Sequence, residues 1–270
     1  MKPVPLDDAH HEHEFGGKAA SLCRARRAGL PVPPGFALPW ALVEAISAGE
    51  AAALAALRGL VDAAGGLVAV RSSAVGEDGA SASFAGQHLT ELHLRTDEQL
   101  LAAIERVWAS ACAASALAYR AKMGIVGPPR MGVVVQRLVD ADCAGVLFTR
   151  HPITGADERV IEAAWGLGEI VVAGLVTPDH YRVARDGRVL ERRAGEKDLA
   201  IRPDPDGGTR EETIDDHRVH GLCLDDGKLA RLGALAAQCE AASPGPHDLE
   251  WAFHREHLYL LQQRAITRSA

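Results

Sequence analysis

The sequence lacks the features that mark membrane-spanning, secreted and nucleic-acid-binding proteins. Its 270 residues carry a net charge of −7, which leaves no basic excess to neutralise a nucleic acid backbone. No apolar signal core stands near the N-terminus, and no run of about eighteen apolar residues could span a bilayer. We therefore expect a cytoplasmic protein whose partners include neither nucleic acid nor a membrane.

Cysteine is scarce, and its spacing provides no Cys-x-x-Cys pair. The five cysteines are scattered along the chain: Cys23, Cys112, Cys143, Cys223 and Cys239. Such spacing is typical of unpaired thiols in a reducing compartment rather than of a disulfide framework. Hydrophobic residues make up 47% and charged residues 24% of the chain, which are ordinary values for a globular protein of one or two domains.

The pattern of apolar residues predicts an α+β protein without internal repeats. Helices are expected at residues 19–28, 40–64, 97–121 and 226–242. Strands are expected at residues 67–70, 87–94, 131–139, 145–149, 158–164, 178–184, 248–253 and 258–264. A stretch rich in Pro, Gly, Asp and Thr, residues 204–216, is expected to be a surface loop. We divide the chain into an N-terminal part, residues 1–125, and a C-terminal part, residues 126–270.

The last two predicted strands carry polar residues at alternate positions. Asp248 and Glu250 would share one face of the first strand, and Gln262 and Arg264 one face of the second. If the strands pair as a hairpin, this set can hold Mg²⁺ through oxygens and a phosphate through the Arg fork. The alternative is an edge hairpin with an ordinary solvated face, and the segment alone does not decide between the two.

Two further motifs favour phosphate binding. Gly16-Gly17-Lys18 precedes a predicted helix, whose first N–H groups attract anions, although the spacing is not that of a P-loop. Arg71 ends a predicted strand and is followed by a loop of small residues, 72–86, that could lie close over phosphate oxygens. The alternatives are a turn before a helix for the first motif and a flexible surface loop for the second.

Two weaker motifs lie in the C-terminal half. The apolar strand 133–139 could end in a hinge whose backbone binds an adenine edge, with Leu138 and Val139 flanking the ring. A plain core strand explains the same pattern. The glycine-rich turn 166–168 leads to Glu169, which could approach a metal, a ribose or a basic side chain, or be solvated.

The motifs, taken in order, resemble one known family. They are Gly-Gly-Lys, Leu-Pro-Val-Pro-Pro-Gly-Phe, Val-Arg-Ser-Ser, Ser-Phe-Ala-Gly-Gln, Gly-Val-Leu-Phe-Thr, Gly-Leu-Gly-Glu, Thr-Pro-Asp, Asp-Leu-Glu-Trp and Leu-Gln-Gln-Arg. Over residues 14–268 the chain is similar to the ATP-binding domain of the pyruvate phosphate dikinase, phosphoenolpyruvate synthase and rifampicin phosphotransferase family. The resemblance implies an ATP-grasp fold, in which two α+β subdomains hold the nucleotide between them, and it implies ATP and Mg²⁺ as cofactors.

The resemblance also implies roles for particular residues. Lys18 would hold ATP phosphates, Arg71 would stabilise the transferring phosphoryl group, and Arg264 would contact the phosphates. The loop 72–87, with Ser83, Gly86 and Gln87, would close over the phosphates. Glu169 would be an acid of the nucleotide site, and Gln136, Leu138 and Val139 would line the adenine hinge. Glu250 and Gln262 would bind Mg²⁺, with Asp248 beside them.

The chain departs from the family in three ways. The usual Arg-Pro-Ile-Thr ending is Arg264-Ala265-Ile266-Thr267, and residues 45–66 form a shorter stretch than in relatives. No phosphohistidine motif is recognisable among the twelve histidines, and the chain ends after the ATP domain. We therefore expect an ATP-dependent, AMP-forming phosphotransferase subunit of the dikinase type, whose acceptor histidine lies on a separate protein. The alternatives are a kinase or ligase that acts directly on a small molecule and a non-catalytic nucleotide-binding regulator.

Overall fold

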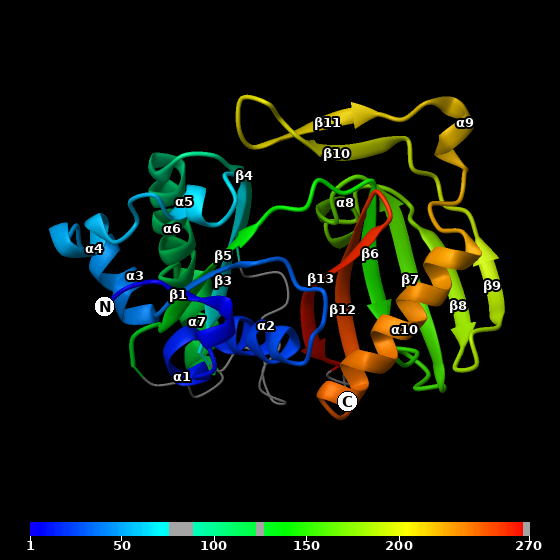
Figure 1. Ribbon diagram of the computed structural model, residues 1–270, viewed down its shortest axis with the longest axis horizontal. Coiled ribbons are helices and arrows are strands. Elements are labelled where there is room, and N and C mark those ends of the chain that lie inside the picture. Colours follow the sequence, from blue (N-terminus) through cyan, green and yellow to red (C-terminus); the bar gives the residue numbers. More distant parts are fainter. Residues whose placement is uncertain (76–88, 123–126, 267–270) are drawn as a thin grey trace. The chain divides into compact units, whose positions relative to one another are not determined.

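The computed structural model describes residues 1–75, 89–122 and 127–266, which pack into two compact units (Figure 1). Unit 1 contains Met1–Arg27, Pro33–Leu138 and Pro205–Gly208, and unit 2 contains Ala28–Val32, Val139–Asp204 and Thr209–Ala270. The main boundary lies after Leu138 rather than after residue 125. The reason is that the strand Met131–Arg137 pairs on both sides within the sheet of unit 1.

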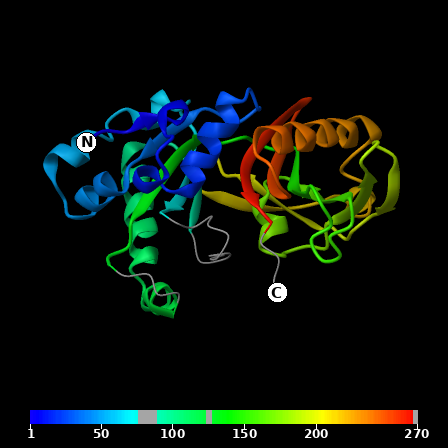
Figure 2. The same cartoon turned by 90° about the horizontal axis from the view of Figure 1, so that it is seen from below.

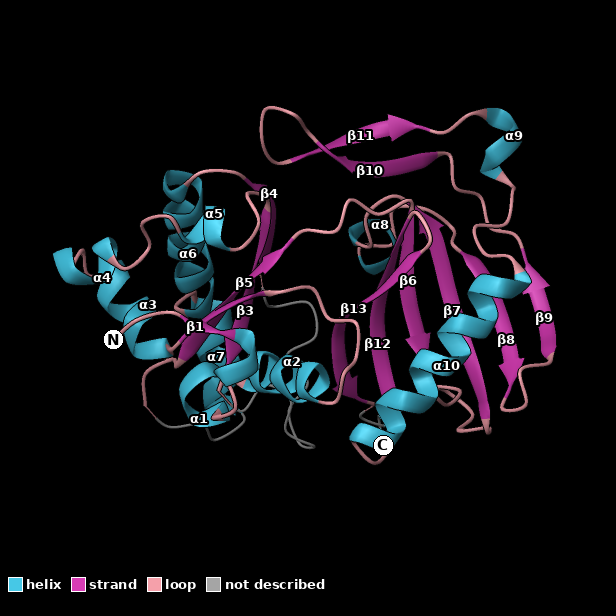
Figure 3. Ribbon diagram, viewed as in Figure 1, coloured by secondary structure: helices cyan, strands magenta, loops and turns pink. Residues whose placement is uncertain are grey.

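Unit 1 is built on a five-stranded antiparallel sheet with the order β1-β2-β5-β3-β4 (Figure 3). Its strands are β1 (Val4–Pro5), β2 (Gly35–Leu38), β3 (Val68–Ala74), β4 (Thr90–Leu94) and β5 (Met131–Arg137). Every residue of β3 is buried. Its residues 72–74, expected to begin a loop, instead extend the strand, because they pair with β5.

Helices surround this sheet and bury its apolar face. They are η1 (Leu6–Asp8), α1 (Glu12–Phe15), α2 (Gly17–Arg27), α3 (Trp40–Ser47), α4 (Ala51–Ala55), α5 (Leu60–Ala63), α6 (Asp97–Ala111) and α7 (Ala114–Lys122). The single helix expected at residues 97–121 is interrupted after Ala111. There the Ser110 hydroxyl donates to the Val107 carbonyl oxygen at 2.7 Å, a side-chain bond that competes with the helical ladder.

Unit 2 is built on a six-stranded antiparallel sheet with the order β13-β12-β6-β7-β8-β9. Its strands are β6 (Cys143–Phe148), β7 (Glu158–Trp165), β8 (Asp179–Ala184), β9 (Val189–Arg193), β12 (His247–His254) and β13 (His257–Ala265). Helix α10 (Asp226–Ala242), with the bounds expected from the sequence, covers one face of this sheet (Figure 2). It begins at the N-cap Asp225, whose side chain accepts from the Lys228 amide at 2.8 Å. The other helices are the single turns α8 (Glu169–Val172) and α9 (Asp216–Val219).

Part of the stretch expected to be a surface loop, residues 204–216, forms a strand. Within it, β11 (Thr209–Thr213) pairs with the preceding strand β10 (Leu199–Pro203) in a separate two-stranded sheet. Residues 204–208 connect the two strands, and there Gly207 and Gly208 have φ of +107° and +74°, a region that favours glycine. The composition of this stretch therefore predicted the turn, but it did not predict strand β11. Among the described residues, no helix is both long enough and apolar enough to cross a bilayer.

Candidate functional site

In unit 1, the start of helix α2 lies directly against strand β3. Gly16 has a φ of +84°, and a Cβ added to it would stand 1.9 Å from the Ser73 carbonyl oxygen, so only glycine fits there. The Ala19 amide donates to Ser73 Oγ at 3.0 Å. The buried Lys18 ammonium donates to the Ser72 carbonyl oxygen at 2.8 Å. The structure therefore brings the Gly-Gly-Lys and Arg-Ser-Ser motifs together into one packed cluster.

Arg71 belongs to this cluster but lies in the middle of its strand. It was expected at a strand end, yet it pairs with Val134 of β5 and Thr90 of β4. Arg71 shares a strand face with Ser73, which is the face that contacts α2. The side chain is buried. A buried guanidinium and a buried ammonium on neighbouring segments give this cluster a concentration of positive charge suited to an anionic ligand.

The expected hinge lies where the chain passes from one unit to the other. Leu138 is the last residue of the main segment of unit 1, and Val139 is the first of unit 2. Gln136 is buried in β5, and its side-chain amide donates to the Pro33 carbonyl oxygen at 3.3 Å. The side chain of Gln136 is thus engaged within the sheet. Ser83, Gly86 and Gln87 lie outside the described residues.

In unit 2, the terminal hairpin brings its four polar residues to one face. The register of β12 and β13 places Asp248 opposite Arg264, and Glu250 opposite Gln262. Directly opposed residues of an antiparallel pair project to the same side of the sheet. Two carboxylates, one amide and one guanidinium therefore form a compact group, which we call the hairpin site.

A β-bulge at Leu261 creates this arrangement. Glu250 pairs with Gln262, but the next residue of β12, Trp251, pairs with Leu260, so Leu261 is the extra residue. Simple alternation would place Gln262 and Arg264 on the face of the buried Leu260. The extra residue reverses the phase of β13 and turns both polar side chains to the side of Glu250. Sequence alternation grouped the residues correctly within each strand but could not reveal the bulge.

Asp248 and Arg264 form an ion pair at the centre of the hairpin site. Arg264 Nε and Nη2 lie 2.7 Å and 2.5 Å from Asp248 Oδ2. The Asp248 side chain is only 9% exposed, whereas that of Arg264 is 41% exposed. Burial raises the pKa of Asp248, Arg264 lowers it, and nearby Glu250 raises it further, so the net direction is upward. Burial therefore outweighs the ion pair.

The other oxygen of this carboxylate is available for a ligand. Asp248 Oδ1 is buried and has no hydrogen-bond partner among the described residues. Together with the oxygens of Glu250 and Gln262, it offers the hard donors that Mg²⁺ prefers. Nowhere in the described part of the chain do three or more His, Cys, Asp or Glu side chains converge on a metal position. Mg²⁺ usually takes only one or two carboxylates and completes its shell with water and phosphate, so the hairpin site still fits this ion.

Glu169 approaches the same face of the sheet. A Cβ added to Gly168 would lie 3.6 Å from Ala144 Cβ, and Ala144 lies opposite Ala252, which alternates with Glu250 on β12. Glu169 begins α8 directly after Gly168. The turn that carries Glu169 therefore lies on the face of the hairpin site, opposite the face that α10 covers.

Sequence analysis missed another acid on this face. Glu162 of β7 lies opposite Val146 of β6, which in turn lies opposite Glu250. The row Glu162, Val146, Glu250 and Gln262 thus crosses four strands on one side of the sheet. Glu162 is half-buried. The alternation of strand 158–164 contained this signal, but the neighbouring strands could not be identified from sequence.

Residues 39–270 match the family described as "Pyruvate phosphate dikinase, AMP/ATP-binding domain". The prodigiosin synthesizing transferase PigC of Serratia marcescens is 36% identical over 98% of this chain and 33% of its own length. A probable phosphoenolpyruvate synthase of Methanothermobacter thermautotrophicus is 42% identical over 74% of this chain and 29% of its own length. A rifampicin phosphotransferase of a Streptomyces species is 41% identical over 74% of this chain and 23% of its own length. The chain thus spans a third or less of these three relatives.

One solved structure, C-terminally truncated Cdc123 from Schizosaccharomyces pombe, has a similar fold. Its TM-score is 0.50 at 9% identity, with coverage of 96% of this chain and 85% of that chain. At this identity the likeness concerns the fold alone. The α+β fold class expected from the sequence is confirmed.

Proposed function

Because this chain belongs to the pyruvate phosphate dikinase AMP/ATP-binding domain family, we propose that it binds MgATP and starts phosphoryl transfer to a histidine on a separate protein. The observation that carries the proposal is the hairpin site. The register of its strands places two carboxylates, an amide and an arginine on one face. Asp248 Oδ1 is buried and has no hydrogen-bond partner among the described residues. This is a donor set for a metal bound to phosphate.

The proposed roles follow from the chemistry of each side chain. Asp248 Oδ1, Glu250 and Gln262 would hold Mg²⁺, which neutralises phosphate charge when bound. Arg264 is oriented by Asp248 and would contact a phosphate oxygen with its guanidinium. Lys18 and Arg71 would supply the positive charge that a transferring phosphoryl group requires.

The reaction proposed is of the dikinase type. Overall, ATP, water and the acceptor imidazole give AMP, inorganic phosphate and phosphohistidine. Two bonds break: the bond between the α- and β-phosphates, as the β-phosphoryl group goes to the imidazole nitrogen and AMP leaves, and the bond between the β- and γ-phosphates, which water cleaves to release the γ-phosphoryl group as inorganic phosphate. AMP formation thus separates this reaction from that of an ordinary kinase, which forms ADP.

The names of the relatives support an acceptor that lies outside the matched segment. Phosphoenolpyruvate synthase and rifampicin phosphotransferase are named for different products and substrates, yet each matches 74% of this chain. A segment common to both does not select between those acceptors. We therefore place nucleotide chemistry in this chain and acceptor choice elsewhere.

Product analysis tests the proposal. The full chain is incubated with Mg²⁺ and ATP labelled at the β-phosphate, with and without a cell extract as the source of acceptor. We expect AMP, and label on a protein in an acid-labile, alkali-stable form, which is the behaviour of phosphohistidine. Arg71→Met should abolish both, whereas Arg106→Met, which removes an exposed arginine of unit 1 paired with Glu91, should not. ADP without AMP would establish direct transfer to a small molecule instead, and nucleotide binding without turnover would indicate a regulator.

A further inference from the structure

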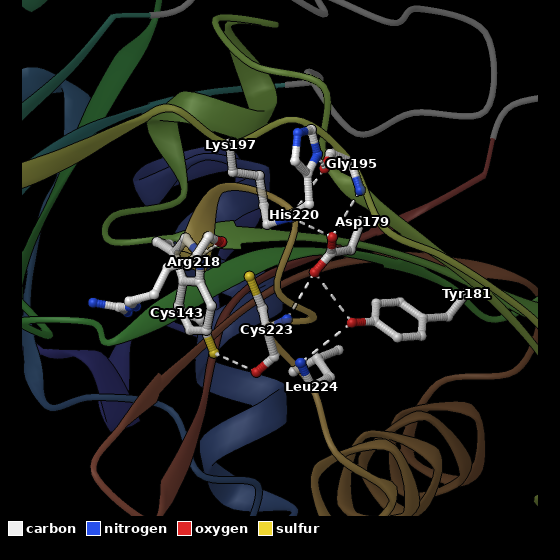
Figure 4. Close-up of polar contacts among 10 residues, drawn as sticks. Cys143, Asp179, Tyr181, Gly195, Lys197, Arg218, His220, Cys223 and Leu224 are labelled. Atoms are coloured by element: carbon white, nitrogen blue, oxygen red, sulfur yellow. Dashed lines mark hydrogen bonds and ion pairs between the residues drawn. The ribbon is translucent and has the colours of Figure 1, made fainter. Parts of the chain in front are cut away.

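A fully buried ion pair lies at the start of strand β8, away from every motif to which the sequence assigned a role (Figure 4). Asp179 and Lys197 side chains are both 0% exposed, and Lys197 Nζ lies 2.5 Å from Asp179 Oδ1. The same oxygen accepts from the Gly195 amide at 2.9 Å. Asp179 Oδ2 accepts from the Tyr181 hydroxyl at 3.2 Å and from the Cys223 amide at 2.7 Å.

These bonds satisfy a charge that would otherwise be costly to bury. Four donors surround one carboxylate, and one of them is a cation, so both buried charges are compensated. Burial is the largest cause that raises the pKa of Tyr181, and the nearby Asp179 carboxylate raises it further. The Tyr181 hydroxyl therefore stays protonated and continues to donate. The pair ties together segments that are distant in sequence, and it is therefore a fixed point of unit 2.

The segment that follows Gly195 holds both ends of the turn that carries Glu169. At one end the Thr177 amide donates to the Glu196 carbonyl oxygen at 3.1 Å. At the other end the Leu167 amide donates to the Ile201 carbonyl oxygen at 2.9 Å. The segment 195–201 is therefore hydrogen-bonded to both ends of the stretch 167–177, and we call this segment the clamp. The ion pair between Lys197 and Asp179 holds the clamp in place.

The fit at both ends of the clamp is close. A Cβ added to Gly195 would lie 2.0 Å from the Thr177 carbonyl oxygen. A Cβ added to Gly166, whose φ is +81°, would lie 2.4 Å from the Ile201 carbonyl oxygen. Neither position tolerates a side chain without movement of the backbone, so the two segments are held at a defined separation.

Helix α8 is a single turn that contacts strands β6, β7 and β10. It contains four residues, of which only Ile170 is buried, while Val172 and, just beyond the helix, Leu175 are 66% and 53% exposed. A single helical turn is not stable by itself and takes its position from its attachments. In addition to the contacts with β6 and β7, the clamp at residues 167 and 177 holds the backbone on both sides of Glu169.

We propose that Lys197, held by Asp179, is a positioning residue that sets the location of Glu169 at the nucleotide site. The proposal rests on the proposed function, which assigns MgATP to the hairpin site, because the turn that carries Glu169 lies on the face of that site. Lys197 itself is buried and acts only through the segment 195–201.

A double-mutant cycle on MgATP affinity tests the proposal. The dissociation constant is measured by calorimetry for the full chain, Lys197→Met, Glu169→Gln and the double variant. We expect each single variant to weaken binding about tenfold, as is typical when a residue behind a ligand is lost. The double variant should be within about twofold of the weaker single variant, because both changes remove the same interaction. Fold-changes that multiply would overturn the proposal.

Two further variants keep the test decisive. Arg185→Met removes an ion pair with Glu240 beyond the other end of β8, so it should lower the unfolding midpoint while leaving MgATP affinity unchanged. If Lys197→Met does not fold, Gly166→Ala displaces the other end of the clamp and should show the same non-additivity with Glu169→Gln. If Glu169→Gln alone leaves affinity unchanged, Glu169 does not act at the nucleotide site, and the positioning role fails with it. If Glu169→Gln weakens binding but neither clamp variant does, only the positioning role fails.

Discussion

The ion pair of the hairpin site predicts that Arg264→Gln and Asp248→Asn lower the free energy of unfolding by different amounts. Arg264→Gln leaves the buried Asp248 carboxylate without its cation, whereas Asp248→Asn removes the buried charge itself. Breaking a buried pair costs about 3–5 kcal/mol, and an exposed pair is worth about 0.2–1 kcal/mol. Asp248 is 9% and Arg264 is 41% exposed, so Arg264→Gln should cost about 1–3 kcal/mol, between these limits.

Asp248→Asn should cost less than Arg264→Gln. Burial raises the pKa of Asp248 even with Arg264 present, so the charged form of this side chain is disfavoured by its environment. Asparagine keeps the shape and removes the charge, and we expect a change of about 1 kcal/mol or less. The double variant should resemble Asp248→Asn alone, because the arginine has no charge left to compensate.

The pH dependence of this asymmetry has a definite sign. The folded pKa of Asp248 lies above its ordinary value of 3.8, so the folded state binds this proton more tightly than the unfolded state does. The contribution of Asp248 to stability is therefore most favourable below the unfolded pKa and declines as pH rises through the folded pKa. The cost of Arg264→Gln should accordingly be largest near neutral pH and should shrink as Asp248 becomes protonated.

Urea unfolding of the four proteins, followed by circular dichroism at neutral pH and near pH 4, measures these differences. Arg106→Gln is the matched control, because its pair with Glu91 is exposed on the arginine side at 51%, and it should cost no more than about 1 kcal/mol. If Asp248→Asn costs as much as Arg264→Gln at neutral pH, Asp248 is not a buried charge held by Arg264. The reasoning about the hairpin site would then be refuted.

Three further changes test the packing that builds the candidate site. Gly16→Ala should cost about 3 kcal/mol in urea unfolding, because it adds a clash to a positive φ, whereas Gly29→Ala, with φ of +78° and open space around it, should cost only about 1 kcal/mol. Insertion of one alanine between Gln262 and Gln263 should turn Arg264 toward the buried face and abolish MgATP binding in calorimetry, whereas deletion of Leu261 removes only the extra residue of the bulge, leaves Gln262 and Arg264 on the side of Glu250, and should preserve binding. Thr96→Ala removes the side-chain N-cap of α6 and should lower stability by about 1 kcal/mol, whereas Thr96→Ser should not.

Many of the helices and strands could be predicted from patterns that are local in sequence. Helix 226–242 was predicted with the bounds that the structure shows, because an Asp N-cap precedes a stretch rich in Ala and Leu. The terminal hairpin was predicted because two apolar runs flank a short polar break. Within each strand, alternation also identified the residues that share a face.

The features that the sequence did not predict depend on contacts between residues that are distant in sequence. Arg71 lies inside β3, because β5, some sixty residues later, extends the pairing to Ala74. The bulge at Leu261 exists only in relation to β12. Asp179 was part of a family motif with no assigned role, and its partner Lys197 stands in a stretch without any motif. A side chain's role in such clusters depends on contacts that no local pattern encodes.

The most direct test of the central claim is the Mg²⁺ dependence of ATP affinity at the hairpin site. Calorimetry is performed with and without Mg²⁺ on the full chain, on Glu250→Ala and on Glu256→Ala. Glu256 lies in the turn of the same hairpin, 87% exposed, and serves as the control. We predict that Mg²⁺ strengthens ATP binding in the full chain and in Glu256→Ala but not in Glu250→Ala. An undiminished Mg²⁺ effect in Glu250→Ala would contradict the claim that the hairpin site holds the metal.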